Sequence, residues 1–146
     1  LLQRRADVEK IYVFLLTAGK AAYEADNALD EVYGDLWLNA YMDAALDMLW
    51  QYVYVLQGND GKHVSRPVGP GLYGMDASAL RQIFAVLDGE RIQVELLEGG
   101  LMSPVKSFAG LFILTGQPWQ FGEDCQNCPG GASSCRYCKL GYSRNG

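Results

Sequence analysis

The stretch "DLWLNAYMDAALDMLWQYVYVLQ", residues 35–57, is predicted to form a helix that is apolar on about three sides. Its polar residues before Gln57 recur at intervals of four, so they share one narrow stripe of the helix surface. The stripe consists of Asp35, Asn39, Asp43, Asp47 and Gln51. A helix with so little polar surface lies at the centre of a fold or is shared with a partner. We therefore expect a protein partner or a homo-oligomer to use this helix.

Aromatic side chains are frequent in the same segment. They are more typical of a core or an interface than of a ligand cage, and the candidates for a partner interface are Trp37, Trp50, Tyr52 and Tyr54. The length of the segment approaches that of a membrane span. However, Asp43 and Asp47 lie near its middle, where each would cost about 2.5–3.5 kcal/mol in a bilayer. We therefore expect no membrane span here.

The segment before this helix has its apolar residues at helical spacing. Residues 6–28 are predicted to be a helix, with Gly34 as the break before the next one. The two helices are expected to pair, which gives an N-terminal helical hairpin over residues 1–57.

Beyond the hairpin, residues 58–75 are expected to be a Gly/Pro-rich connecting loop, and residues 76–118 a small α+β unit. The elements expected in this unit are a helix at 77–87 capped by Asp76 and antiparallel strands at 91–97, 101–108 and 111–115. The last two strands are separated at Gly110. The whole chain is thus predicted to be of the α+β class, ending in a metal-binding tail at 119–146.

The tail contains two Cys-x-x-Cys pairs with six residues between them. The four cysteines are Cys125, Cys128, Cys135 and Cys138. Each pair presents two sulfurs to one side of a metal, and the residues Pro129 to Gly131 suit the tight reversal between the pairs. Four thiolates satisfy tetrahedral Zn²⁺ and leave no open position. The spacing therefore predicts a structural zinc site, of the kind found in four-cysteine zinc fingers.

Other uses of the four cysteines remain open. An iron–sulfur cluster also takes four thiolates, but the spacing differs from the bacterial ferredoxin pattern. A thioredoxin-like redox pair is expected between a strand and a helix, which is not the predicted setting here. Two disulfides become the favoured interpretation if the protein is secreted.

The motifs "CQNCPGG" and "CRYCKLG" resemble the Cys-x-x-Cys-x-Gly-x-Gly repeats in the zinc modules of DnaJ-type co-chaperones. The resemblance covers about the last 20 residues. It implies a zinc-binding module, but the glycine pattern departs from the family's. The chain contains no His-Pro-Asp motif, so co-chaperone activity is not implied.

Basic residues accompany the cysteines. Arg136, Lys139 and Arg144 lie beside aromatic residues in the tail, a pattern that makes them candidate nucleic-acid contacts. Cations near a zinc–thiolate centre also offset its net negative charge of about −2. The net charge of −5 and the isoelectric point of about 4.8 argue against a protein that mainly coats nucleic acid.

No complete catalytic constellation or nucleotide-binding motif is visible in the sequence. We therefore expect a non-enzymatic interaction protein, an adaptor or a subunit of a larger assembly, stabilised by zinc. The alternatives are a nucleic-acid-associated protein that binds through the tail, and a redox or iron–sulfur protein. No signal peptide is visible, so we expect the protein to be cytoplasmic.

Overall fold

The computed structural model describes residues 7–20, 26–57, 61–71 and 75–117. Its elements, in chain order, are β1 (Val8–Thr17), α1 (Ala28–Gln57), β2 (His63–Val64), α2 (Ala79–Val86), the 3-10 helix η3 (Gly89–Ile92), β3 (Glu95–Leu96), β4 (Met102–Ser103) and β5 (Ser107–Thr115). Two antiparallel sheets and the helices make an α+β fold, which confirms the predicted class at this level.

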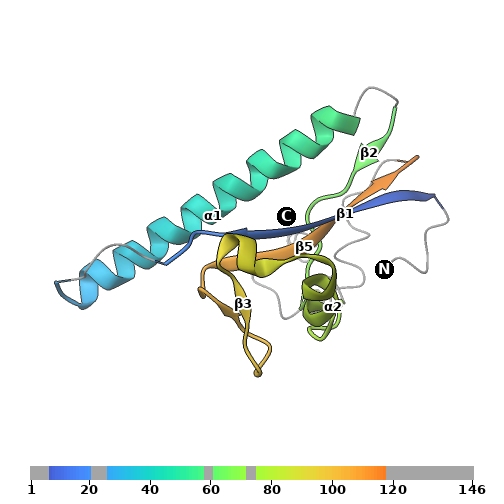
Figure 1. The fold of residues 1–146 in the computed structure, drawn as a ribbon. Helices are drawn as coiled ribbons and strands as arrows, with labels where there is room; N and C mark the ends of the chain where they lie inside the picture. The colour runs from blue at the N-terminus through green and yellow to red at the C-terminus, as the bar shows by residue number, and fades with distance from the viewer. Residues whose placement is uncertain (1–6, 21–25, 58–60, 72–74, 118–146) are drawn as a thin grey trace, which may run out of the picture.

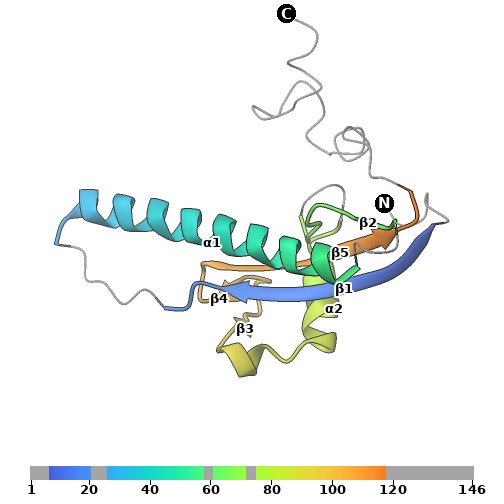
Figure 2. The same ribbon diagram turned by 90° about the horizontal axis from the view of Figure 1, so that it is seen from above.

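The larger sheet has three strands in the order β1-β5-β2, with β5 antiparallel to both neighbours. β3 and β4 form a separate two-stranded sheet. α1 packs on one face of the larger sheet, whereas α2 and the β3–β4 hairpin lie on the other (Figures 1 and 2). The two long strands are therefore covered on both faces.

The predicted helix at residues 6–28 is wrong, because residues Val8–Thr17 form β1. Alternate side chains of β1 enter two different hydrophobic clusters, with Phe14 facing α1 and Val13 and Leu15 facing α2. A strand that is buried on both faces is a nearly continuous apolar run. Periodicity cannot separate such a run from a buried helix, and the proposed N-terminal helical hairpin is replaced by a strand followed by one long helix.

α1 starts earlier than predicted. The side-chain oxygen of Asn27 accepts hydrogen bonds from the backbone N–H groups of Leu29 (2.9 Å) and Asp30 (3.1 Å), so Asn27 caps the helix. The helix then continues through Gly34, which was expected to be a break. A single glycine costs a helix only about 1 kcal/mol relative to alanine, and a 30-residue helix absorbs that cost.

The two strands predicted at 101–108 and 111–115 are instead β4 and a β5 that runs unbroken through Gly110. An added Cβ at Gly110 would lie 2.7 Å from the carbonyl oxygen of Val68 and 2.9 Å from the ring of Phe14. Glycine is thus required here by a close backbone approach, which is a common reason for glycine inside a strand.

The predicted helix at 77–87 corresponds to α2, and Asp76 lies just before it. Asp76 accepts a hydrogen bond from the backbone N–H of Ser78 at 2.8 Å, and its side-chain and backbone hydrogen bonds with Ser78 lower its pKa. The predicted strand 91–97 is mostly wrong. η3 occupies its first residues, Gln93 is left-handed with φ 58°, and only Glu95–Leu96 pair as β3.

Within the connecting loop predicted at 58–75, part of the described segment 61–71 pairs with the larger sheet. β2 pairs with the end of β5, and Val68 forms a bridge to Leu111. Ser65 is 1% exposed and joins the segment to the sheet. Its hydroxyl accepts from the N–H of Ile113 (2.9 Å) and donates to the carbonyl of Arg66 (2.8 Å).

Candidate interaction surface

α1 is fixed to the sheet through its C-terminal half. Leu46, Leu49, Trp50 and Val53 pack in the cluster around Phe112. The N-terminal half of the helix extends past the end of the sheet in both ribbon views (Figures 1 and 2). This half therefore lies largely beyond the sheet, and polar contacts with Lys106 link it to the rest of the chain.

These polar contacts come from the stripe of acidic and amide side chains. Lys106, just before β5, pairs with Asp35 at 2.6 Å and donates a hydrogen bond to Asn39 at 2.8 Å. Further along the helix, Arg66 lies 3.5 Å from Asp47. Three residues of the polar stripe, Asp35, Asn39 and Asp47, thus contact cations from other parts of the same chain, so the stripe is not only a solvated face.

Large apolar side chains of α1 also face solvent. Residues with more than half of their surface exposed are Leu29, Val32, Tyr33, Leu36, Trp37, Tyr41, Met48, Tyr52, Val55 and Leu56. Single exposed apolar residues are normal on protein surfaces, but contiguous apolar patches mark interaction sites. Here the exposed residues follow one helix along its whole length.

The four aromatic residues predicted to form a partner interface divide into two groups. Trp37, Tyr52 and Tyr54 are 64%, 63% and 46% exposed. Trp50 is half-buried against the core, and its indole N–H donates to the carbonyl of Ser65 at 2.9 Å. Its ring also stacks on Tyr54 at 5.3 Å and lies under the guanidinium of Arg66 at 4.8 Å. Trp50 therefore anchors the helix to the body.

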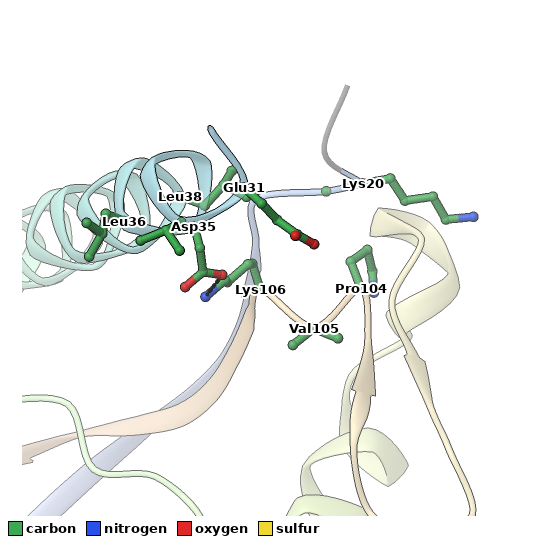
Figure 3. Close-up of a pocket in the computed structure, with 10 residues that line it drawn as sticks. Lys20, Glu31, Asp35, Leu36, Leu38, Pro104, Val105 and Lys106 are labelled. Atoms are coloured by element: carbon green, nitrogen blue, oxygen red, sulfur yellow. Dashed lines mark ion pairs between the residues drawn. The ribbon is translucent and has the colours of Figure 1, made fainter. Parts of the chain in front are cut away.

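An open groove of about 670 Å³ lies beside the N-terminal half of α1. Its lining comes from the end of β1, the first turns of α1 and the β4–β5 connection, and consists of Gly19, Lys20, Glu31, Val32, Asp35, Leu36, Leu38, Pro104, Val105 and Lys106. Figure 3 shows Lys106 meeting Asp35 across the groove, while the side chain of Lys20 extends away from it. A smaller groove continues between Asn39 and Phe108.

The groove combines an engaged cation with exposed apolar side chains. Its central cation, Lys106, is already shared between Asp35 and Asn39. Leu36 and Val105 present apolar surface, 57% and 85% exposed, on either side of this contact. The arrangement suits an apolar side chain that enters from outside and leaves the ion pair in place.

The predicted metal and nucleic-acid residues lie outside the described residues. These are Cys125, Cys128, Cys135, Cys138, Arg136, Lys139 and Arg144. Within the part of the chain that the structure describes, no three His, Cys, Asp or Glu side chains gather as a metal site would require. The zinc site and the tail contacts therefore stay predictions.

The predicted partner interface of Trp37, Trp50, Tyr52 and Tyr54 did not include Tyr41, Met48 and Val55, which are 64%, 70% and 71% exposed. Their signal was present in the sequence, since they recur with Trp37 and Tyr52 at spacings of three or four residues. The spacing alone did not say whether this side of the helix faces the core or solvent.

Among the described helices, none is both long and apolar enough to cross a membrane, in agreement with the expectation from Asp43 and Asp47. We also compared the chain with known proteins. It matches no protein-family model, no curated protein and no solved structure.

Proposed function

We propose that this chain is a non-enzymatic interaction protein, an adaptor or a subunit of a larger assembly, that binds a protein partner through α1. One observation carries the proposal. The polar stripe of α1 is directed to Lys106 and Arg66 of the same chain, while aromatic and aliphatic side chains such as Trp37 are directed to solvent. A surface helix usually turns a polar face to solvent, whereas α1 has one apolar side against the sheet and a second apolar side exposed.

The energetics favour a covered α1. Burying apolar surface gains about 25 cal/mol per Å², so covering a side chain as exposed as Met48 (70%) gains roughly 1–2 kcal/mol. Several such residues in a row supply enough free energy to offset part of the entropy lost on association. The aromatic residues Trp37 and Tyr41 are of the type that dominates binding energy at interfaces.

Photo-cross-linking tests the proposal directly. A photoreactive residue at Met48 of α1 is compared with the same residue at Val86 of α2, because both positions are 70% exposed. The full chain carrying each label is irradiated in its native cells. We expect the label at position 48 to give a covalent adduct with another protein, seen as a discrete band of higher mass. The label at position 86 should not give this band. Equal labelling at both positions, or no adduct at position 48, would contradict the proposal.

Zinc is the second part of the proposal. Four thiolates from Cys125, Cys128, Cys135 and Cys138 are the donor set that structural Zn²⁺ prefers. The segment has few apolar residues, so metal binding would supply much of its folding free energy. We expect about one zinc ion per purified chain, and loss of most of it in Cys125→Ser, measured by elemental analysis. Iron in place of zinc would support the iron–sulfur alternative instead.

A further inference from the structure

One side of α1 has the spacing of a helix–helix contact. Six residues, which we call the seam, follow one another at intervals of three or four: Trp37, Tyr41, Ala44, Met48, Tyr52 and Val55. With 3.6 residues per turn, these positions lie on one side of the helix over about five turns. Ala44 is exposed, and the other five are 63–71% exposed. The seam is therefore continuous and open.

The seam lies apart from most of the charges of the helix. α1 contains five acidic residues and no lysine or arginine. Two of the acids, Asp35 and Asp47, pair with cations of the body. The seam itself is uncharged, and its border on the helix surface is formed mainly by Ala40, Gln51, Ala45 and Leu56. The one acidic residue at this border is Asp47, three residues after Ala44, and its charge is paired with Arg66.

This charge pattern favours a second copy as the occupant. In helix pairs, charged residues beside the apolar seam select the partner and reject others. A partner selected through basic residues would find only Asp47 at the border of the seam, and Asp47 already pairs with Arg66. Two identical helices, by contrast, bring only Asp47 of each copy near the two-fold axis, and each Asp47 is paired with Arg66 of its own chain.

The sizes of the side chains favour an antiparallel pair. Consider two antiparallel copies of α1 with the two-fold axis at the level of Leu46 along the helix. Trp37 of one copy then lies opposite Val55 of the other, and Ala44 lies opposite Met48. At these two positions a large residue faces a small one, which helps helices to pack closely, and Tyr41 lies beside Tyr52 of the other copy. A parallel pair in register would place Trp37 against Trp37 and Ala44 against Ala44. The antiparallel arrangement also sets the two helix dipoles in opposite directions.

The exposed area is near what such a contact needs. Trp37, Tyr41 and Tyr52 each expose nearly two thirds of their surface. Aromatic side chains bury about 150–250 Å² each, so these three offer roughly 400 Å² per copy. Met48, Val55 and the residues beside them extend this area toward the roughly 800 Å² per partner of a standard interface. A dissociation constant in the micromolar range is consistent with an interface at the low end of size.

We propose that the seam is covered by a second copy of this chain, in an antiparallel dimer through α1. The inference rests on the proposed function and names the partner for the same surface. In this dimer the N-terminal half of α1, which extends past its own sheet, lies along the C-terminal half of its partner (Figure 2). Every seam residue is then used twice, once on each side of a two-fold axis.

A matched pair of variants tests the dimer by sedimentation equilibrium of the full chain. Val55→Lys changes the seam, and Val86→Lys makes the same change at the end of α2, where the valine is 70% exposed compared with 71% for Val55. We expect a concentration-dependent dimer for the wild type and for Val86→Lys. Val55→Lys should raise the dissociation constant about tenfold or more, because each dimer loses two apolar contacts.

Mixing two variants tests the antiparallel register. Trp37→Glu and Val55→Lys should each weaken the dimer alone. In an equimolar mixture, the new glutamate lies opposite the new lysine, while the other end of the pair keeps its native Val55 and Trp37. We expect the mixture to dimerise more tightly than either variant by itself. A mixture no tighter than the two variants overturns the antiparallel register.

The outcomes separate this inference from the proposed function. A wild type that sediments as a monomer up to about 100 µM overturns the dimer, since micromolar affinity would be saturated there. If such a monomer still gives a cross-link from position 48 to a different protein, the proposed function stands and only the identity of the partner is wrong. Equal weakening by Val55→Lys and Val86→Lys also overturns the dimer, because the contact would not then depend on the seam.

Discussion

Gly110 occupies a point of β5 where two other parts of the chain leave no room for a side chain. We predict that Gly110→Ala destabilises the protein by about 1–3 kcal/mol, because the new methyl group would lie 2.7 Å from the Val68 carbonyl and 2.9 Å from the Phe14 ring. Urea unfolding followed by circular dichroism measures the change. Gly99→Ala is the control, since an added Cβ there meets nothing within 4 Å. Equal effects of the two substitutions would contradict the close approach.

Ser65 is the second residue on which the sheet depends. Its hydroxyl is the acceptor for the buried N–H of Ile113, in the strand at the centre of the sheet. Ser65→Ala removes that acceptor, and an unsatisfied buried donor costs about 1–3 kcal/mol. We predict a loss of stability in this range in a urea titration. An unchanged unfolding midpoint would show that the Ile113 N–H finds another acceptor.

At the scale of the element, α1 is held unequally along its length. Its C-terminal half has the core beneath it, whereas Lys106 links the N-terminal half to the body through Asp35 and Asn39. An exposed ion pair contributes about 0.2–1 kcal/mol. We therefore predict that Lys106→Gln speeds amide hydrogen exchange in residues 28–42 roughly twofold to fivefold, with little change in residues 46–57.

Arg66→Gln is the control for this experiment. It removes the same charge from a residue that pairs with Asp47 and covers Trp50, both beyond the N-terminal half of the helix. Exchange in residues 28–42 should stay near its wild-type rate. If both variants speed exchange in that segment equally, the effect comes from the net charge of the protein and not from the Lys106 contact.

At the scale of the whole molecule, the core and the proposed zinc site are separate in sequence. Every cysteine lies in residues 119–146, whereas α1 and both hydrophobic clusters lie in residues 7–117. We predict that chelation of zinc leaves most of the helical circular dichroism signal intact and speeds tryptic cleavage after Arg136 and Lys139. Loss of the helical signal on chelation would show that the metal organises the entire fold.

The sequence located two helices best, because each has its polar and apolar residues at clear helical spacing. The helix predicted at 35–57 forms and ends at the predicted Gln57, although it begins at Ala28, and the helix predicted at 77–87 forms within two residues of its predicted ends. The predictions failed where side chains pack against clusters on both faces of a strand and so remove the periodic signal, as in β1, and where a glycine was taken to end an element. Gly34 and Gly110 are both inside elements, since one is tolerated by a long helix and the other is required by a neighbouring backbone.

The sequence by itself determined that residues 35–57 form a helix with one polar stripe, that the chain is of the α+β class, and that its cysteines are spaced for a four-thiolate metal site. These features depend on local spacing along the chain. Only the tertiary structure decided which side of the helix faces solvent. Lys106 and Arg66 lie far from the helix N-terminus in sequence and meet the acidic stripe only after the sheet has formed. These contacts, together with the packing of the C-terminal half of α1 on the sheet, leave Trp37, Tyr41 and Tyr52 exposed to solvent.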